Sequence, residues 1–307
     1  MIDIRKDQCV GCGACADACG VGCISMLGDA EGFAYPEIDK TKCVNCGACD
    51  KACPALNVGN EREKIPGTLL AVNRDEAVVG ASSSGGVFSA LADKVISEGG
   101  IVFGAAFDSD FGVHHIFAEN SDELEKLRTS KYVQSNTGDI YSVVRRELKS
   151  GRKVLFSGTP CQVNAMRLFL SDNILRPSCY SCPAKGNNRL ADITIADAWG
   201  MNENNPLDSN NRGLSLIFLR TPRGDAAINN ISDAVKMCAA DYNKAVANNP
   251  SAVKSVPVPP TRQKCMDAIL SDENADFVKI AEKYAFHKST AQKAKSLLKR
   301  AVRKIIK

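Results

Sequence analysis

The stretch "CVGCGACADAC" at residues 9–19 decides the fold of the N-terminal region, because it returns almost unchanged as "CVNCGACDKAC" at residues 43–53. Each copy carries four cysteines in the order C-x2-C-x2-C-x3-C. This doubled spacing is typical of bacterial ferredoxins with two [4Fe–4S] clusters, in which the fourth cysteine of a copy binds the other cluster. The repeat therefore predicts a small module of thiolate ligands for two clusters.

The exchange of the fourth cysteine predicts two sets of ligands. The set for cluster one is Cys9, Cys12, Cys15 and Cys53, and the set for cluster two is Cys43, Cys46, Cys49 and Cys19. Cys23 is then surplus, and we interpret it as a small buried residue. Zinc is the alternative metal, but paired zinc sites usually combine two CxxC units across a longer loop, so the spacing favours iron and sulfide.

The whole chain has 307 residues, of which 44% are apolar and 24% charged, as is typical of a soluble globular protein. Its length suggests about two domains, and a net charge of +4 does not indicate binding to nucleic acid. The opening "MIDIRKDQC" lacks the apolar core of an export signal, so we expect a cytoplasmic protein. In that reducing compartment, fourteen cysteines indicate metal binding rather than disulfides.

After the polar linker "NVGNEREKIPGT" (57–68), segments of strand and helix character alternate, which predicts the α/β class. Strands are expected within 68–73, 152–158, 190–199 and 214–221, with a hairpin over 101–120. Helices are expected within 84–100 and 139–151 and from residue 222 onward. In the hairpin, His114 and His115 are neighbours on an alternating strand, so one should point inward and neither is predicted to bind metal.

Three stretches of this region carry candidate chemistry. "GASSSGG" (80–86) opens a helix and suits a phosphate, while an ordinary N-cap by Ser83 or Ser84 is the alternative. "VLFSGTPCQV" (154–163) places Cys161 at a helix N-terminus, and with no convincing histidine partner we interpret it as a metal ligand. "RPSCYSCPAK" (176–185) adds Cys179 and Cys182, which with Cys161 fall one thiolate short of a third cluster; a redox dithiol or structural cysteines are the alternative.

Together, the stretches "ASSSGG", "KYVQS", "GTPCQV", "LRPSCYSC" and "DITIADAWG" resemble the coenzyme F-420 hydrogenase/dehydrogenase beta-subunit family, up to about residues 249–260. The resemblance implies an α+β ferredoxin-like dicluster module at residues 1–58, followed by an α/β flavin-binding-type domain at residues 67–270. In the family, a stretch with a Cys-His-Gly motif follows the segment resembling "GTPCQ". That stretch is absent here, which leaves the third cluster without a fourth cysteine.

The resemblance also implies a site for FAD, although it identifies no catalytic residue. The residues placed near the FAD phosphates are Ser83, Ser84, Gly85 and Gly86. The residues expected to line the same pocket are Lys131, Tyr132, Gln134 and Ser135.

The function implied by this resemblance is that of an iron–sulfur flavoprotein oxidoreductase. Electrons would pass between the 4Fe-4S clusters and FAD, with hydride exchange to an unknown organic substrate and with a redox protein as partner. The alternatives are a non-catalytic electron carrier and an accessory protein of surface-polysaccharide biosynthesis. The sequence identifies neither the electron donor and acceptor nor the use of coenzyme F-420.

The C-terminal segment 277–307 is predicted to form a basic amphipathic helix. Residues 288–307 hold eight lysines and arginines and no acid, and apolar residues recur at helical spacing. Such a helix can lie on an anionic membrane, here the inner face, whereas packing on its own domain is the alternative. Nucleic acid is not an expected partner, because the segment has no aromatic residue after Phe286 to stack on bases.

Overall fold

The computed structural model describes residues 2–57, 65–171, 190–201 and 213–254, together with a few single positions outside these ranges. Compact packing divides the chain into one unit of residues 1–27 and 34–256 and a second unit of residues 28–33 and 257–307. Cys179, Cys182 and all of segment 277–307 except Lys283 lie outside the described residues. Within the described part, no helix is both long enough and apolar enough to cross a membrane.

The cysteine repeat folds into a small module with matching turns. Its two copies each end in a one-turn helix that begins after a glycine in the left-handed conformation, Gly13 at φ 74° and Gly47 at φ 76°. Two strands between the copies pair into a two-stranded sheet. The elements in chain order are α1 (Ala14–Asp17), β1 (Ile24–Gly28), β2 (Ala34–Ile38), α2 (Ala48–Lys51) and α3 (Pro54–Asn57).

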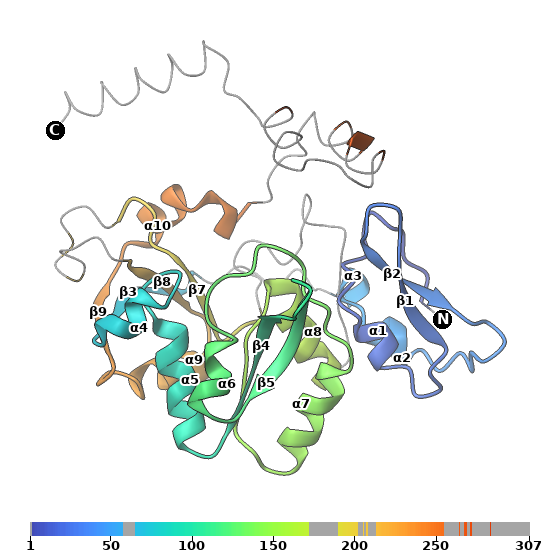
Figure 1. Ribbon diagram of the computed structural model, residues 1–307, viewed down its shortest axis with the longest axis horizontal. Coiled ribbons are helices and arrows are strands. Elements are labelled where there is room, and N and C mark those ends of the chain that lie inside the picture. Colours follow the sequence, from blue (N-terminus) through green and yellow to red (C-terminus); the bar gives the residue numbers. More distant parts are fainter. Residues whose placement is uncertain are drawn as a thin grey trace. The chain divides into compact units, whose positions relative to one another are not determined.

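The second region comprises the described residues between 65 and 254. Four of its strands form an antiparallel sheet in the order β7–β8–β3–β9 (Figure 1). Alternate residues of β3 face two apolar clusters, Ala71 lying in one and Leu70 in the other. This alternation shows that both faces of the sheet are covered. The strands are β3 (Gly67–Asn73), β7 (Ile193–Asp197), β8 (Ser215–Leu219) and β9 (Val235–Ala239).

A second, three-stranded sheet in the described part has the order β5–β4–β6. The predicted hairpin is confirmed, because β4 (Ile101–Phe107) and β5 (Val113–Ala118) pair antiparallel. β6 (Val154–Phe156) lies parallel to β4 on the other side. As the alternation on β5 predicts, His115 is 7% exposed and His114 faces solvent.

Helices connect and cover the two sheets. α5 packs Val87, Ala90 and Leu91 against the four-stranded sheet and Ala92 against the cluster that contains Val102 of β4. The helices of this region are α4 (Glu76–Gly80), α5 (Val87–Ser97), α6 (Ser121–Glu125), α7 (Ile140–Lys149), α8 (Pro160–Ser171), α9 (Pro222–Asn229) and α10 (Tyr242–Asn248), with a 3-10 turn at Pro250–Ala252.

The strand pairing corrects the fold class expected for the second region. Alternating strands and helices predicted an α/β arrangement, but every named strand pair except β4–β6 is antiparallel in the described residues. The fold is therefore mixed α+β, a ferredoxin-like dicluster region followed by a second region of helices and mostly antiparallel sheet. The reason is that pairing direction depends on which strands meet, and local periodicity carries no information about that.

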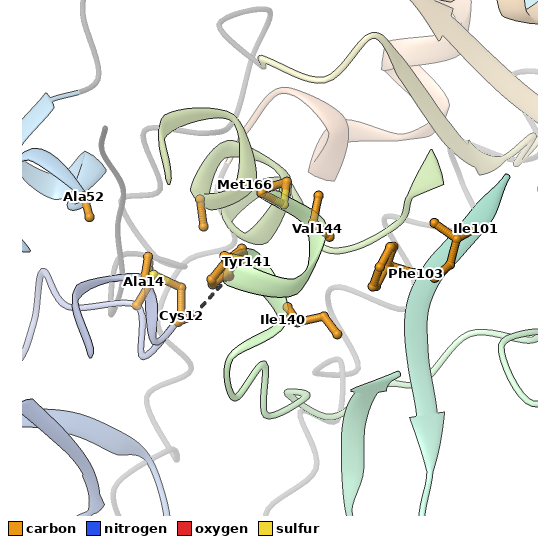
Figure 2. Packing of buried hydrophobic residues seen from close by; sticks show 11 residues of the cluster. Cys12, Ala14, Ala52, Ile101, Phe103, Ile140, Tyr141, Val144 and Met166 are labelled. Carbon is orange, nitrogen blue, oxygen red and sulfur yellow. Dashed lines mark hydrogen bonds between the residues drawn. The ribbon is translucent and has the colours of Figure 1, made fainter. Parts of the chain in front are cut away.

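One apolar cluster joins the cysteine module to the second region. Figure 2 shows Cys12 and Ala14 beside Tyr141 of α7, with Phe103 of β4 and Met166 of α8 farther along the same cluster. Tyr141 and Phe103 are fully buried. Burial of aromatic side chains this large contributes a few kcal/mol each to the stability of the fold. Because residues of both parts lie in this cluster, the first copy of the repeat shares a core with the second region.

Candidate metal centres

The eight predicted ligands line two cavities in the described part of the chain. One cavity is bordered by Cys9, Cys12, Cys15 and Cys53, together with apolar residues such as Ile2 and Met26. The other is bordered by Cys19, Cys43, Cys46 and Cys49, and Cys23 lies on its wall. Each cavity thus collects three cysteines from one copy of the repeat and the fourth from the other copy. The structure brings each predicted ligand set together around its own cavity.

The arrangement of these thiols bears on the kind of metal centre they can hold. In the described part, no three or more Cys, His, Asp or Glu side chains are arranged to hold a metal ion. A [4Fe–4S] cluster is held instead by four cysteine thiolates, one to each iron, so its ligands surround a volume. Two cavities, each bordered by its four predicted cysteine ligands, fit that donor set.

Left-handed residues shape the two ligand loops in the same way. In the first copy Gly11 has φ 50°, and the residue at the matching position of the second copy, Asn45, has φ 53°. Asparagine is one of the few residues with a side chain that adopts this conformation readily. The first copy needs glycine for a second reason, because a Cβ atom on Gly11 would lie 2.6 Å from the Ala34 carbonyl oxygen.

Burial favours the protonated form of three thiols of the first cavity, those of Cys12, Cys15 and Cys53. Removal from water raises the pKa of Cys15 to about 12 and that of Cys53 to about 11, and it raises the pKa of Cys12 as well. Neighbouring cysteines add to the effect at Cys15, with Cys9 the largest contributor. Metal binding must therefore displace these protons, which couples occupancy of the site to folding and pH.

Side chains of the second region hold the first ligand loop in place. The hydroxyls of Thr137 and Tyr141 donate to the Cys12 carbonyl oxygen at 2.7 and 3.0 Å, the latter drawn as the dashed line in Figure 2. The amide of Gln134 donates to the Gly11 carbonyl at 3.0 Å. These contacts fix the backbone of the loop that carries Cys9 and Cys12.

A further contact comes from α1. The carboxylate of Asp17 accepts hydrogen bonds from both the backbone N–H, at 2.9 Å, and the hydroxyl of Ser142, in the first turn of α7. Acidic groups at a helix N-terminus are favoured by the helix dipole. In the second copy, Lys51 stands at the matching position, in the last turn of α2, and it has no carboxylate to accept such hydrogen bonds. The repeat is therefore asymmetric in the residues that contact the second region.

The small-residue loop predicted to bind phosphate packs against two strands of the four-stranded sheet. The Gly85 N–H donates to the Ser215 hydroxyl at 2.9 Å, and the Ser84 hydroxyl lies 3.1 Å from the same oxygen. Gly86 has φ 72° and directly precedes α5. A side chain on Gly85 would clash with the Ala71 carbonyl at 2.5 Å. Glycine at these positions is explained by close packing and turn geometry.

The four predicted FAD residues of the "KYVQS" stretch lie in four different environments. Ser83 accepts a hydrogen bond from the Ser130 N–H at 2.8 Å, which brings the loop of Lys131 beside the small-residue loop. The Lys131 ammonium donates to backbone carbonyls of residues 126, 128 and 129, and burial lowers its pKa. Tyr132 is 90% exposed. Gln134 contacts the cluster loop described above, and Ser135 enters a buried polar network.

Sequence reasoning missed that network. The Ser135 hydroxyl lies 2.9 Å from His115 Nδ1 and accepts from the Gln162 amide at 2.8 Å. His115 Nε2 lies 3.1 Å from the Ser157 carbonyl, and the Gln162 Oε1 atom accepts from the Thr159 N–H at 2.9 Å. Burial lowers the pKa of His115, so the ring is neutral. One indication of this network was present in the sequence, because the alternation along β5 predicts that one histidine of the His114–His115 pair points into the protein.

Cys161 lies at the start of α8, next to this network. Its sulfur is 3.0 Å from the Thr159 hydroxyl, and its side chain packs on the cluster that contains Cys12. The other two cysteines predicted for a third site, Cys179 and Cys182, lie outside the described residues. Cys161 therefore shares an apolar cluster with Cys12, a predicted ligand of cluster one, but it does not line the first cavity.

Comparison with known protein families gives matches in both regions of the chain. Residues 8–57 match a 4Fe-4S dicluster domain, and residues 35–87 match a second family of that description. Residues 170–245 match the C terminus of the coenzyme F420 hydrogenase/dehydrogenase beta subunit. The chain therefore combines a 4Fe-4S dicluster domain with a segment that matches the C terminus of the F420 hydrogenase/dehydrogenase beta subunit. The predicted resemblance is confirmed, and the chain is an iron–sulfur electron-transfer protein related to that beta subunit.

The chain is also similar to a chain of known structure. A chain of the F420-reducing [NiFe] hydrogenase complex from Methanosarcina barkeri is similar at 14% identity, over 69% of this chain and 95% of that chain, with a TM-score of 0.46. No curated protein matches this chain.

Proposed function

We propose that this protein is an iron–sulfur flavoprotein oxidoreductase that passes electrons between two 4Fe-4S clusters and FAD and exchanges a hydride with an organic substrate. The observation that carries the iron–sulfur part is the crossed lining of the two cavities, each with three thiols from one copy of the repeat and one from the other. The flavin part is supported by the match of residues 170–245 to the beta-subunit family. When bound, the clusters would supply single-electron transfer and FAD would supply the exchange between one- and two-electron chemistry.

The cysteines would hold the clusters as the spacing predicts. Cluster one takes Cys9, Cys12, Cys15 and Cys53, and cluster two takes Cys19, Cys43, Cys46 and Cys49. Buried apolar neighbours of the first cavity exclude water, and backbone N–H groups such as that of Gly11, 3.5 Å from the Cys9 sulfur, support the thiolate charge. Both effects tune the reduction potential of a bound cluster.

Residues of the second region would bind FAD around the start of α5. Ser83, Ser84, Gly85 and Gly86 precede this eleven-residue helix, whose N-terminal dipole favours phosphate. The Ser83–Ser130 hydrogen bond supports a place for the Lys131 cation at the same site. Gln134 and Ser135 contribute by position, since Gln134 fixes the loop of cluster one and Ser135 orients the neutral His115 ring.

The asymmetry of the repeat suggests an order for the two clusters. Cluster one is next to the second region, because Gln134, Thr137 and Tyr141 all bond to its ligand loop. Cluster two has a solvent-exposed ligand, Cys46, and an exposed valine, Val44, at its cavity. We infer that a redox protein exchanges electrons at cluster two, while cluster one exchanges them with the flavin side.

The experiment is cofactor analysis of anaerobically purified full-length protein. About eight irons and eight sulfides per chain are expected for two such clusters, with one FAD. Protein that holds its clusters but neither carries nor binds flavin would contradict the oxidoreductase and favour the electron carrier. The electron carrier would also reduce an added protein acceptor while turning over no small molecule.

A further inference from the structure

Cys23 lies beside a predicted ligand of cluster two, a position that its interpretation as a small buried residue does not explain. Its side chain is 4% exposed and its sulfur lies 3.3 Å from the sulfur of Cys19, the fourth ligand assigned to cluster two. The backbone N–H of Cys23 points at the same Cys19 sulfur, also at 3.3 Å. Cys23 further lines the cavity of cluster two together with its four assigned ligands. A fifth thiol therefore lies in direct contact with a ligand sulfur.

The repeat provides an internal comparison for this contact. The residue of the second copy that matches Cys23 is Asn57, and the ligand that matches Cys19 is Cys53. The Asn57 amide donates to the backbone carbonyls of Asp50 and Cys53. The matched residue thus stabilises the end of its helix rather than a ligand sulfur, so the thiol contact distinguishes cluster two from cluster one.

We propose that the Cys23 thiol donates a hydrogen bond to the sulfur of Cys19 when Cys19 binds cluster two, and that this bond holds cluster two at a higher reduction potential. The inference rests on the proposed function, since it requires the clusters. A cysteine bound to iron is a thiolate and has no proton to give, so Cys23 must be the donor. Reduction adds negative charge to the cluster and its sulfurs, and a donated hydrogen bond stabilises the more negative state.

The role of Cys23 is therefore that of a positioning residue, distinct from a ligand. The hydrogen bond would raise the reduction potential of cluster two relative to that of cluster one, in addition to any difference that arises from their unequal burial. Such a difference gives electron flow through the module a preferred direction. The backbone N–H of Cys23 remains in any side-chain variant, so a substitution removes the S–H donor and leaves the backbone hydrogen bond in place.

The test is a redox titration of anaerobically purified full-length protein, followed by visible absorbance and electron paramagnetic resonance, with iron determined on each sample. In Cys23→Ala the potential of one cluster should fall while the other potential and the iron content stay unchanged. In Cys23→Ser, which keeps a hydroxyl donor, part of the shift should be recovered. Cys238→Ala, which removes a half-buried thiol from β9, is the matched control and should change neither potential.

Three results would overturn the proposal. Unchanged potentials in Cys23→Ala would remove the hydrogen bond from consideration, and equal shifts in the alanine and serine variants would show that only volume matters. Loss of about four irons in Cys23→Ala would make Cys23 a ligand. Wild-type protein without iron would instead contradict the proposed function itself, and the inference would fall with it.

Discussion

Replacing Gly11 by asparagine gives the first copy of the repeat the residue that the second copy carries. The backbone conformation is no obstacle, because Asn45 already has φ 53° where Gly11 has φ 50°. The obstacle is space, since the new Cβ would lie 2.6 Å from the Ala34 carbonyl oxygen and 3.2 Å from the Gln134 amide nitrogen. A carbonyl on β2 cannot rotate away as a flexible side chain could, so the ligand loop itself has to shift.

The cost follows from two contributions. Overpacking of a well-filled site costs about 1–3 kcal/mol, and loss of the Gln134–Gly11 hydrogen bond adds about 1 kcal/mol. The opposite exchange, Asn45→Gly, is the matched control, because it fits the same φ and should change stability by only about 0.5 kcal/mol. Gly11→Asn should therefore be the less stable variant by a few kcal/mol and should lose iron from cluster one first.

The assay is urea unfolding of both anaerobically purified variants, followed by circular dichroism and by cluster absorbance, with iron measured beforehand. Gly11→Asn should unfold at clearly lower urea than Asn45→Gly and hold fewer irons. Equal midpoints and equal iron contents would refute the argument, since they would show that the approach of Gly11 to β2 does not constrain the loop.

Three further predictions can be checked separately. Cys12→Ser should lose about four irons and destabilise the N-terminal module, as iron and circular dichroism will show, because ligation energy is folding energy in small metal domains; full iron content would contradict the ligand assignment. His115 is buried and its pKa is lowered, so below about pH 6.5 the imidazole is protonated in the unfolded chain before it is protonated in the folded chain. The contribution of His115 to the free energy of unfolding should therefore be constant above that pH and decrease below it. In urea unfolding at a series of pH values, His115→Gln should reduce this decrease. Removal of residues 288–307 should abolish a weak, salt-sensitive binding to anionic vesicles in a sedimentation assay; binding that persists without them, or none at low salt, would exclude the membrane role.

Local patterns made the cysteine module predictable. The spacing of thiols within eleven-residue copies is set by a short backbone turn, so the division of ligands between two sites could be stated before any contact was known. The hairpin over β4 and β5 was predictable for the same reason, because its strands adjoin in the chain and alternate in polarity.

Contacts between distant segments were not predictable from the sequence. The hydrogen bonds of Thr137 and Tyr141 to Cys12 join residues more than a hundred positions apart, and no local spacing encodes them. The antiparallel pairing of β3 with β8 and β9 is non-local as well, which is why the α/β expectation failed. Cys23 was expected to be buried, but its contact with Cys19 depends on how the chain turns between them.

In the proposed function, electrons pass between cysteine-bound clusters and FAD within one chain. Rapid mixing of anaerobic protein with a one-electron donor tests it directly, with cluster and flavin absorbance followed at separate wavelengths. In the wild type, flavin reduction should follow cluster reduction and reach completion. In Cys12→Ser, which disrupts the cluster beside the second region, flavin reduction should become much slower while cluster two is still reduced. Equal rates of flavin reduction in both proteins would contradict the account.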